Sequence, residues 1–226
     1  MLPIERAFRW AGGAIFVGAL AFCGYTFIVV WSREAGFEPA AVAADGLLFS
    51  VFAMHHSVFA REPVKGWIAR LVPERLVRSM YVWIASLLLT SVCMLWRTIG
   101  GQVYDDSGWL AAVHAGVQAA GLLLIAGAVR RIDALELAGI REHSAQEPLQ
   151  ITGPYRLVRH PIYLGWLLAT FGVSHMTGDR LVFAGISAVY LVVAMPFEER
   201  ALRRAFGDTY ARYEKLVRWR VVPYIY

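Results

Sequence analysis

Long runs of apolar residues restrict the fold of this chain more than any other feature. Four such runs lie near residues 8–31, 43–60, 79–99 and 109–129. A helix needs about 20 mostly apolar residues to cross the hydrocarbon core of a bilayer. Two shorter runs follow, at residues 161–174 and 181–197. The pattern therefore predicts an all-α membrane protein with six transmembrane helices.

The composition agrees with membrane integration. The chain is 58% hydrophobic and 17% charged, with a mean hydropathy of +0.50, whereas a soluble domain carries about 25% charged residues. Its pI is about 9.4. In a membrane protein, Lys and Arg set the topology and meet anionic lipid, so we expect contact with membrane lipid and none with nucleic acid. Cys23 and Cys93 form neither a disulfide framework nor a metal-ligand spacing, and no metal site is expected.

The distribution of Lys and Arg predicts the orientation. The N-terminus, the second and fourth connections and the C-terminal tail together hold nineteen of these residues, and the three remaining connections hold one each. Cytoplasmic segments carry an excess of Lys and Arg. We therefore expect both termini in the cytoplasm, with the protein in a bacterial inner membrane.

The C-terminal part has its own pattern. The run 161–174 extends only about 21 Å as a helix, and the polar stretch "SHMTGDR" separates it from the last run as a tight turn. We interpret the two runs as a short helical hairpin. Beyond them, Leu202, Phe206, Tyr210, Tyr213 and Val217 recur at steps of three and four, which predicts an amphipathic helix on the membrane surface, with a break at Gly207-Asp208. Residues 1–130 are expected to form four spans, and residues 131–226 a separate functional region.

Unusual polar residues gather at the cytoplasmic ends of the predicted spans. His55 and His56 lie near the end of the second span, His160 begins the fifth, and Glu198 and Glu199 end the sixth. Charged residues at membrane depth usually face a cavity or a partner. These residues therefore mark a candidate site.

The stretch "GPYRLVRHPIYLGW" indicates which kind of ligand the candidate site would bind. Pro161 favours the first helical position and keeps His160 outside the helix, at its N-terminus. Such a terminus attracts anions, and Arg156 and Arg159 add hydrogen-bond donors. An acidic pair opposite this donor-rich segment suits a zwitterionic ligand.

The same residues carry a family resemblance. The C-terminal half resembles integral-membrane methyltransferases, a group with isoprenylcysteine carboxyl methyltransferases, phospholipid methyltransferases, methanethiol S-methyltransferases and NnrU-like proteins. The shared pattern is R-H-P-x-Y-x-G, a short hairpin, a Glu pair and Y-x-x-Y. In this chain the matching residues are Arg159, His160, Pro161, Tyr163, Gly165, Glu198, Glu199, Tyr210 and Tyr213. The stretches "MHHSVFAREPVKGW" and "RSMYVW" resemble the thiol-methylating and NnrU-like branch.

The resemblance implies an enzyme that moves a methyl group from S-adenosylmethionine to a small or lipophilic acceptor. A thiol is favoured over a prenylcysteine carboxylate or a phospholipid amine. His55, His56 and Arg159 are expected to be catalytic, with a histidine accepting the thiol proton. The residues expected to bind the cofactor are Tyr155, His160, Pro161, Tyr163, Gly165, Glu198 and Glu199.

Two alternatives stay open. One is a sterol-reductase-like enzyme, which would use NADPH and need a cationic cluster for the 2′-phosphate. Arg130, Arg131, Arg156 and Arg159 are candidates for that cluster. The other is a non-catalytic NnrU-like membrane protein.

Overall fold

The structure is a computed structural model that describes residues 2–141 and 148–226. It is helical apart from one small sheet, in which β1 pairs with β2, and this confirms the predicted all-α membrane fold. In chain order the elements are α1 (Pro3–Tyr25), the π-helical turn η1 (Thr26–Val30), α2 (Pro39–Val58), α3 (Glu62–Ile68), α4 (Glu74–Leu95), β1 (Gln102–Asp105), α5 (Gly108–Val129), α6 (Ala134–Leu137), the 3-10 turn η2 (Gly153–Arg156), α7 (Pro161–Phe171), β2 (His175–Thr177), α8 (Gly178–Phe206) and α9 (Asp208–Leu216).

Five helices are long and apolar enough to cross a membrane. They are α1 with its continuation η1, α2, α4, α5 and α8. Large apolar side chains stay exposed along them, among them Val17, Leu47, Leu87, Leu123 and Val193. A soluble protein rarely leaves so many apolar groups in water, so these faces are suited to lipid.

The predicted fifth span is shorter than a membrane helix, and the count of six transmembrane helices is not confirmed. Helix α7 has 11 residues, or about 16 Å. It packs against α5, and non-helical chain continues from Gly172 to β2. There the N–H of Asp106 donates to the carbonyl of Ser174 over 2.8 Å. Residues 161–174 thus form a short helix along α5 and a non-helical segment after it.

The predicted polar turn before the last helix is therefore partly a strand. His175, Met176 and Thr177 form β2 beside β1. Three residues without alternating exposure give no local pattern that predicts a strand. The strand depends on a pairing partner some 70 residues earlier in the chain.

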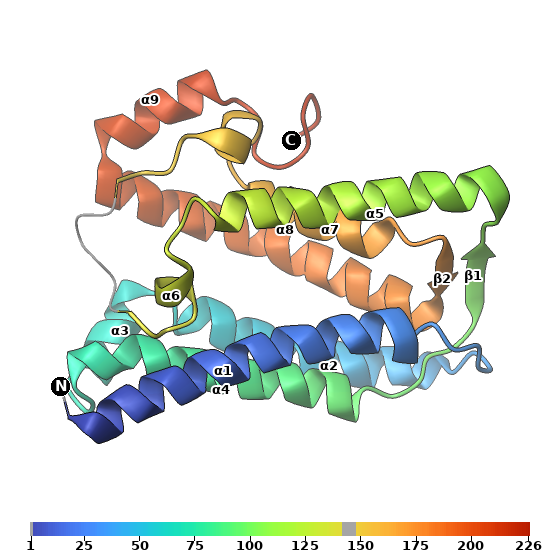
Figure 1. Cartoon of the computed structure of the whole chain (residues 1–226), viewed down its shortest axis with the longest axis horizontal. Coiled ribbons are helices and arrows are strands. Elements are labelled where there is room, and N and C mark those ends of the chain that lie inside the picture. The colour runs from blue at the N-terminus through green and yellow to red at the C-terminus, as the bar shows by residue number, and fades with distance from the viewer. Residues whose placement is uncertain (1, 142–147) are drawn as a thin grey trace. The chain divides into compact units, whose positions relative to one another are not determined.

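The chain divides into two compact units. The first contains η1, α1 to α4 and α6, together with Thr177–Asp179. In it, α1 and α2 each pack against α4, and α1 and α4 run alongside each other in Figure 1. Glu5, Arg9, Gly12 and Cys23 are among the buried residues of α1, at the spacing of one helical face.

A buried carboxylate closes one end of the first unit. Asp179 accepts hydrogen bonds from the indole of Trp96 at 2.9 Å and from the backbone N–H groups of Ile99 and Gly100 at 2.8 Å. A buried charge is tolerated when several donors satisfy it. Here Asp179 holds the connection that leaves α4.

The second unit contains β1, α5, η2, α7, α9, the C-terminal tail and α8 from Arg180 onward. Its α5 and α7 approach at glycines. A Cβ on Gly165 would lie 2.7 Å from the carbonyl oxygen of Gly121 and 2.7 Å from Cγ1 of Ile125. Small residues permit this close packing between membrane helices, and it fixes α7 along α5.

The predicted amphipathic segment is divided at the predicted position. Helix α8 ends at Phe206 and α9 begins at Asp208. Gly207 has φ +49°, a backbone conformation that other residues rarely adopt. Tyr210, Tyr213 and Val217 form a buried cluster against Leu149, Leu202 and Phe206.

Candidate functional site

A buried ion pair forms the base of the candidate site in the second unit. Arg159 donates through Nε to Oε1 of Glu199 at 2.8 Å, and its Nη2 lies 2.7 Å from the same oxygen. The side chains of Arg159 and Glu199 are only 7% and 2% exposed. Nη1 of Arg159 donates to the carbonyls of Val217 and Arg218, each at 2.9 Å. One guanidinium therefore connects the start of α7, helix α8 and the C-terminal tail.

The C-terminal tail completes this arrangement. The N–H groups of Arg159 and His160 donate to the carbonyls of Trp219 and Arg220 at 2.9 and 2.8 Å. Nε of Arg220 lies 3.1 Å from Oε2 of Glu199. Each carboxylate oxygen of Glu199 thus pairs with an arginine, Oε1 with Arg159 and Oε2 with Arg220. These ion pairs connect α8 with the start of α7 and with the C-terminal tail.

Glu198 faces the other way. Its side chain is 51% exposed, and Oε2 lies 3.7 Å from Nδ1 of His160. Oε1 accepts a short hydrogen bond from the hydroxyl of Tyr163. The rings of His160 and Tyr163 stack, with centroids 5.1 Å apart. Nε2 of the buried His160 lies 3.4 Å from Oε1 of Glu199 and makes no well-directed hydrogen bond within the described part of the chain.

An apolar cavity of about 290 Å³ adjoins these polar groups. Tyr163 and Leu167 of α7 and a stripe on α8 line it, with three residues of the tail. The α8 and tail residues are Ala188, Leu191, Val192, Met195, Val221, Val222 and Tyr226. Tyr163 therefore joins the cavity to the polar groups, because it lines the cavity and also contacts Glu198 and His160.

Tyr155, predicted to bind the cofactor, lies in η2 near this cluster. Its backbone carbonyl accepts a hydrogen bond from the hydroxyl of Tyr213 at 2.7 Å. Burial raises the pKa of the Tyr155 phenol, and the nearby charge of Glu198 adds to the shift. Burial likewise raises the pKa of Tyr213, and it raises that of Tyr210 to about 12. Helix α9 is thus anchored by neutral, buried tyrosines.

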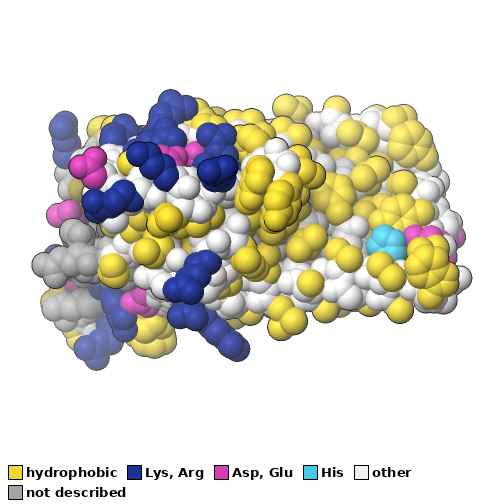
Figure 2. Space-filling view, turned by 90° about the horizontal axis from the view of Figure 1, so that it is seen from above, with side chains coloured by type: hydrophobic (Ala, Val, Ile, Leu, Met, Phe, Trp, Pro, Cys, Tyr) yellow, Lys and Arg dark blue, Asp and Glu magenta, His cyan; other side chains and the backbone are white. Residues whose placement is uncertain are grey.

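The outer face of this region is basic. Figure 2 shows Lys and Arg side chains gathered toward the end of the face that carries α9, and apolar side chains over much of the rest. The exposed basic residues of α8, α9 and the tail are Arg200, Arg203, Arg204, Arg212, Lys215 and Arg218. Such a surface suits anionic headgroups.

Pro161 and Gly165 have structural reasons for their identity. Pro161 is buried at the first position of α7, and His160 is its N-cap with φ −120°. Gly165 faces α5, where a side chain would collide with backbone. Their predicted contacts with a cofactor stay predictions.

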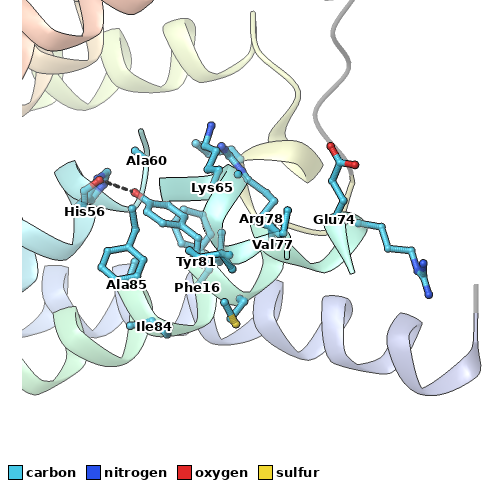
Figure 3. A pocket seen from close by; sticks show the side chains of 18 residues that line it. Phe16, His56, Ala60, Lys65, Glu74, Val77, Arg78, Tyr81, Ile84 and Ala85 are labelled. Carbon is cyan, nitrogen blue, oxygen red and sulfur yellow. Dashed lines mark hydrogen bonds between the residues drawn. The ribbon is translucent and has the colours of Figure 1, made fainter. Parts of the chain in front are cut away.

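His55 and His56 lie in the first unit, at the end of α2. His55 is buried between the rings of Phe59 and Tyr81, with centroids at 4.6 and 5.4 Å. Among the residues that the structure describes, neither of its nitrogens has a hydrogen-bond partner. His56 is exposed, and its Nδ1 lies 2.8 Å from the hydroxyl of Tyr81. Figure 3 shows His56 and Tyr81, joined by this hydrogen bond, among the residues that line a cavity of about 800 Å³. The predicted catalytic role of the two histidines stays a prediction.

Comparison with known proteins identifies the family. Residues 117–209 match the model of the phospholipid methyltransferase family. Methanethiol S-methyltransferase 2 of Bradyrhizobium diazoefficiens is 37% identical over 214 residues, which are 89% of this chain and 82% of that protein. The chain belongs to the family of the methanethiol S-methyltransferases.

Two other relatives agree with this membership. Methanethiol S-methyltransferase of Crocosphaera subtropica is 30% identical, with 90% of each chain covered. Nurim of Mus musculus is 29% identical over 73% of this chain and 69% of that protein. No solved structure matches. Membership of this family makes the chain a membrane methyltransferase, which confirms the predicted enzyme class and the predicted resemblance.

The sequence analysis did not predict several residues that the structure places at the candidate site or beside the predicted histidines. Arg220 pairs with Glu199, Val221 and Tyr226 line the cavity, and Tyr81 holds His56. The tail after α9 has no periodic pattern that would place it. Tyr81 lies in the stretch "RSMYVW". Its phenolic hydroxyl is a feature of the sequence that could have indicated a hydrogen-bond partner for His56.

Proposed function

We propose that this methyltransferase transfers a methyl group from S-adenosylmethionine to a thiol. The observation that carries the proposal is the Tyr163–Glu198–His160 array beside the apolar cavity, in a chain whose relatives are methanethiol S-methyltransferases. The expected site residues Tyr155, His160, Pro161, Tyr163, Gly165, Glu198 and Glu199 belong to the same unit. A methanethiol-sized acceptor is far smaller than a prenylcysteine or a phospholipid.

The residues present fit the methyl donor. S-adenosylmethionine supplies an electrophilic methyl group on a cationic sulfur, beside an ammonium and a carboxylate. Glu198 offers an accessible carboxylate for the ammonium. The stacked rings of His160 and Tyr163 offer aromatic faces, which attract cations. The buried Nε2 of His160 lies 3.4 Å from Oε1 of Glu199 and has no well-directed hydrogen bond among the described residues, so a ligand can offer it a polar contact.

The chain's own groups have three tasks in the transfer. Tyr163 and Glu198 orient the donor, because alignment of the reacting atoms supplies much of the rate in a displacement. The apolar walls from Leu167, Leu191 and Met195 exclude water and hold the hydrocarbon part of the acceptor. Arg159 holds α7, α8 and the tail together through its bonds to Glu199 and to the carbonyls of the tail. Its proposed role is therefore to position these segments around the donor.

A thiol must lose its proton before or during the attack. We propose His56 as the acceptor of that proton, with Tyr81 fixing its ring, and His55 as a second candidate. His56→Ala should lose most of its rate at low pH and recover at alkaline pH, where the thiolate forms unaided. A loss that is the same at every pH would contradict this role.

The proposed location is a bacterial inner membrane with both termini in the cytoplasm. It rests on the Lys and Arg distribution. The basic face of α9 would then lie against the cytoplasmic leaflet, whose lipids are anionic.

Binding distinguishes this function from the NADPH alternative. Arg159 is already committed to Glu199 and two carbonyls, so it is a poor ligand for a 2′-phosphate. Labelled S-adenosylmethionine should bind the detergent-purified protein, and NADPH at the same concentration should neither bind nor compete. Saturable NADPH binding without binding of S-adenosylmethionine would overturn the proposal.

A further inference from the structure

The tail after α9 supplies one wall of the apolar cavity in the second unit. Val221, Val222 and Tyr226 line this cavity of about 290 Å³ together with residues of α7 and α8. Val221 is buried, whereas Tyr226 is 40% exposed, so the ring of Tyr226 lies at the edge of the cavity. The space available to a ligand therefore depends on where the tail holds this ring.

Backbone hydrogen bonds fold the tail back on itself. The carbonyl of Tyr226 accepts hydrogen bonds from three successive N–H groups, those of residues 220–222, at distances between 2.9 and 3.1 Å. The N–H of Tyr226 in turn donates to the carbonyl of Val222 at 3.0 Å. Figure 1 shows this loop beside the label C. Tyr226 thus has a defined place next to residues 220–222.

The side chain of Arg220 joins the Tyr226 ring to the ion pairs of the candidate site. Its Nη1 donates to the hydroxyl of Tyr226 at 2.8 Å, and its Cζ lies 5.1 Å from the centre of that ring. Its Nε lies 3.1 Å from Oε2 of the buried Glu199. An aromatic face attracts a cation, so one arginine holds both the ring and the carboxylate. The ring that bounds the cavity is therefore fixed by the contacts that connect α8 with the tail.

The dimensions of the cavity restrict what can enter it. Drug-sized ligands occupy sites of about 300–1,000 Å³, and this cavity lies at the lower limit of that range. Its lining residues on α8 extend from Ala188 to Met195, which is about 10 Å along the helix axis. Apart from the hydroxyls of Tyr163 and Tyr226, the lining side chains are apolar. Such a space suits a short alkyl group.

We propose that Tyr226 and Val222 limit the length of the thiol that this protein methylates, by closing the cavity around a short alkyl chain. The inference rests on the proposed function, which assigns the hydrocarbon part of the acceptor to this cavity. One methylene more or less changes the rate in a hydrophobic pocket by about 10- to 200-fold, because a longer chain must displace a wall. The substrate class is accordingly an alkanethiol of a few carbons.

Methyl-transfer rates with acceptors of different length test this role. Full-length protein in detergent receives S-adenosylmethionine with methanethiol, propanethiol or hexanethiol, and kcat/KM is measured for each thiol. Tyr226→Ala widens the cavity and should raise the hexanethiol-to-methanethiol ratio about tenfold. Val222→Phe narrows it and should lower the propanethiol-to-methanethiol ratio about tenfold. Partition of the longer thiols into detergent is common to all variants and cancels when these ratios are compared.

Two controls separate the size of the ring from the integrity of the tail. Tyr226→Phe keeps the ring and loses only the hydroxyl that accepts from Arg220, so it should keep the ratios of the parent protein. Ile225→Ala changes an exposed neighbour that does not line the cavity, so it should keep them too. A shift in either control as large as that of Tyr226→Ala would assign the effect to the folding of the tail and overturn the proposal.

The outcomes distinguish failure of this inference from failure of the proposed function. Methylation of thiols with the same ratios in every variant would overturn the role of the tail and leave the thiol methyltransferase intact. A parent protein that methylates none of the thiols would overturn the function itself. Titration with S-adenosylmethionine adds one further check. A loss of donor affinity in Tyr226→Ala, with unchanged ratios, would assign the cavity to the donor and contradict the proposal.

Discussion

At the scale of single residues, two adjacent glutamates have opposite surroundings. Successive residues of a helix point about 100° apart. Glu199 is 1% exposed and is bridged by Arg159 and Arg220, whereas the side chain of Glu198 is 51% exposed beside Tyr163. One carboxylate stabilises the fold of the site, and the other is available to a ligand.

Neutralising each glutamate should separate these roles. Glu199→Gln leaves the buried Arg159 without its charged partner and should lower the free energy of unfolding by about 3–5 kcal/mol. Glu198→Gln should leave thermal unfolding unchanged and weaken binding of S-adenosylmethionine about tenfold, the effect of one charge-assisted hydrogen bond. Thermal scans and isothermal titration in detergent measure the two quantities. The reverse assignment of effects would contradict the division of roles.

The sequence pattern indicated which residues of the candidate site lie together, but not the contacts that each of them makes. Arg159, His160, Tyr163 and the glutamate pair do gather in one unit. The pattern could have distinguished the glutamates, because Met195 and Glu199 lie four residues apart on the buried side of α8. It could not have found Arg220, because the tail is placed by backbone pairing with residues 159 and 160, which has no local signature.

At the scale of elements, α7 is defined by its contact with α5. Gly165→Ala should destabilise the protein by about 1–3 kcal/mol, because the added methyl group meets backbone atoms of α5. Gly185→Ala is the control, since nothing lies within 4 Å of a Cβ at that position of α8. Thermal unfolding should show a loss for the first variant and no loss for the second. Equal midpoints would contradict the close packing.

Helix α9 should make the protein sensitive to alkali. An unfolded tyrosine ionises near pH 10, whereas burial raises the pKa of Tyr210 to about 12 and also raises that of Tyr213. The unfolded state therefore loses these protons first. The stabilisation is complete below pH 10 and is lost as pH rises toward 12.

Unfolding measured from pH 8 to 12 checks this dependence. Tyr213→Phe loses the hydrogen bond to the Tyr155 carbonyl and should cost about 1 kcal/mol at neutral pH. Tyr210→Phe removes a buried hydroxyl that has no hydrogen-bond partner within the described residues, so it should cost little. Both variants should show a shallower alkaline loss than the parent protein. A flat profile for the parent would refute the assignment.

Elements with strong periodicity were predictable, and the element that depends on a distant partner was not. The four N-terminal apolar runs correspond to α1, α2, α4 and α5, and the break at Gly207 is present. The strand β2 depends on β1 for its hydrogen bonds. Helix α7 ends at Phe171, a few residues before β2 begins at His175, so its length is tied to the position of that strand. Neither constraint is visible in the local sequence.

At the scale of the whole molecule, the order of crossings decides where the termini lie. Five helices are long enough to cross the membrane, so both termini lie on one side only if residues 161–174 cross it as well. The proposed cytoplasmic termini rest on the Lys and Arg distribution. Reporter fusions at Tyr226 and near Gly100 should therefore report opposite sides of the membrane. A periplasmic signal from Tyr226 would contradict the topology and move the candidate site away from the cytoplasmic donor.

Direct methyl transfer tests the central claim of a thiol methyltransferase. Purified protein in detergent or nanodiscs is given S-adenosylmethionine labelled in its methyl group, together with methanethiol, a prenylcysteine or a phospholipid amine. We predict label in the methyl thioether alone, and a strongly reduced rate for Glu198→Gln, which should remain folded. Label in the prenylcysteine ester or the phospholipid, with none in the thioether, would contradict the account.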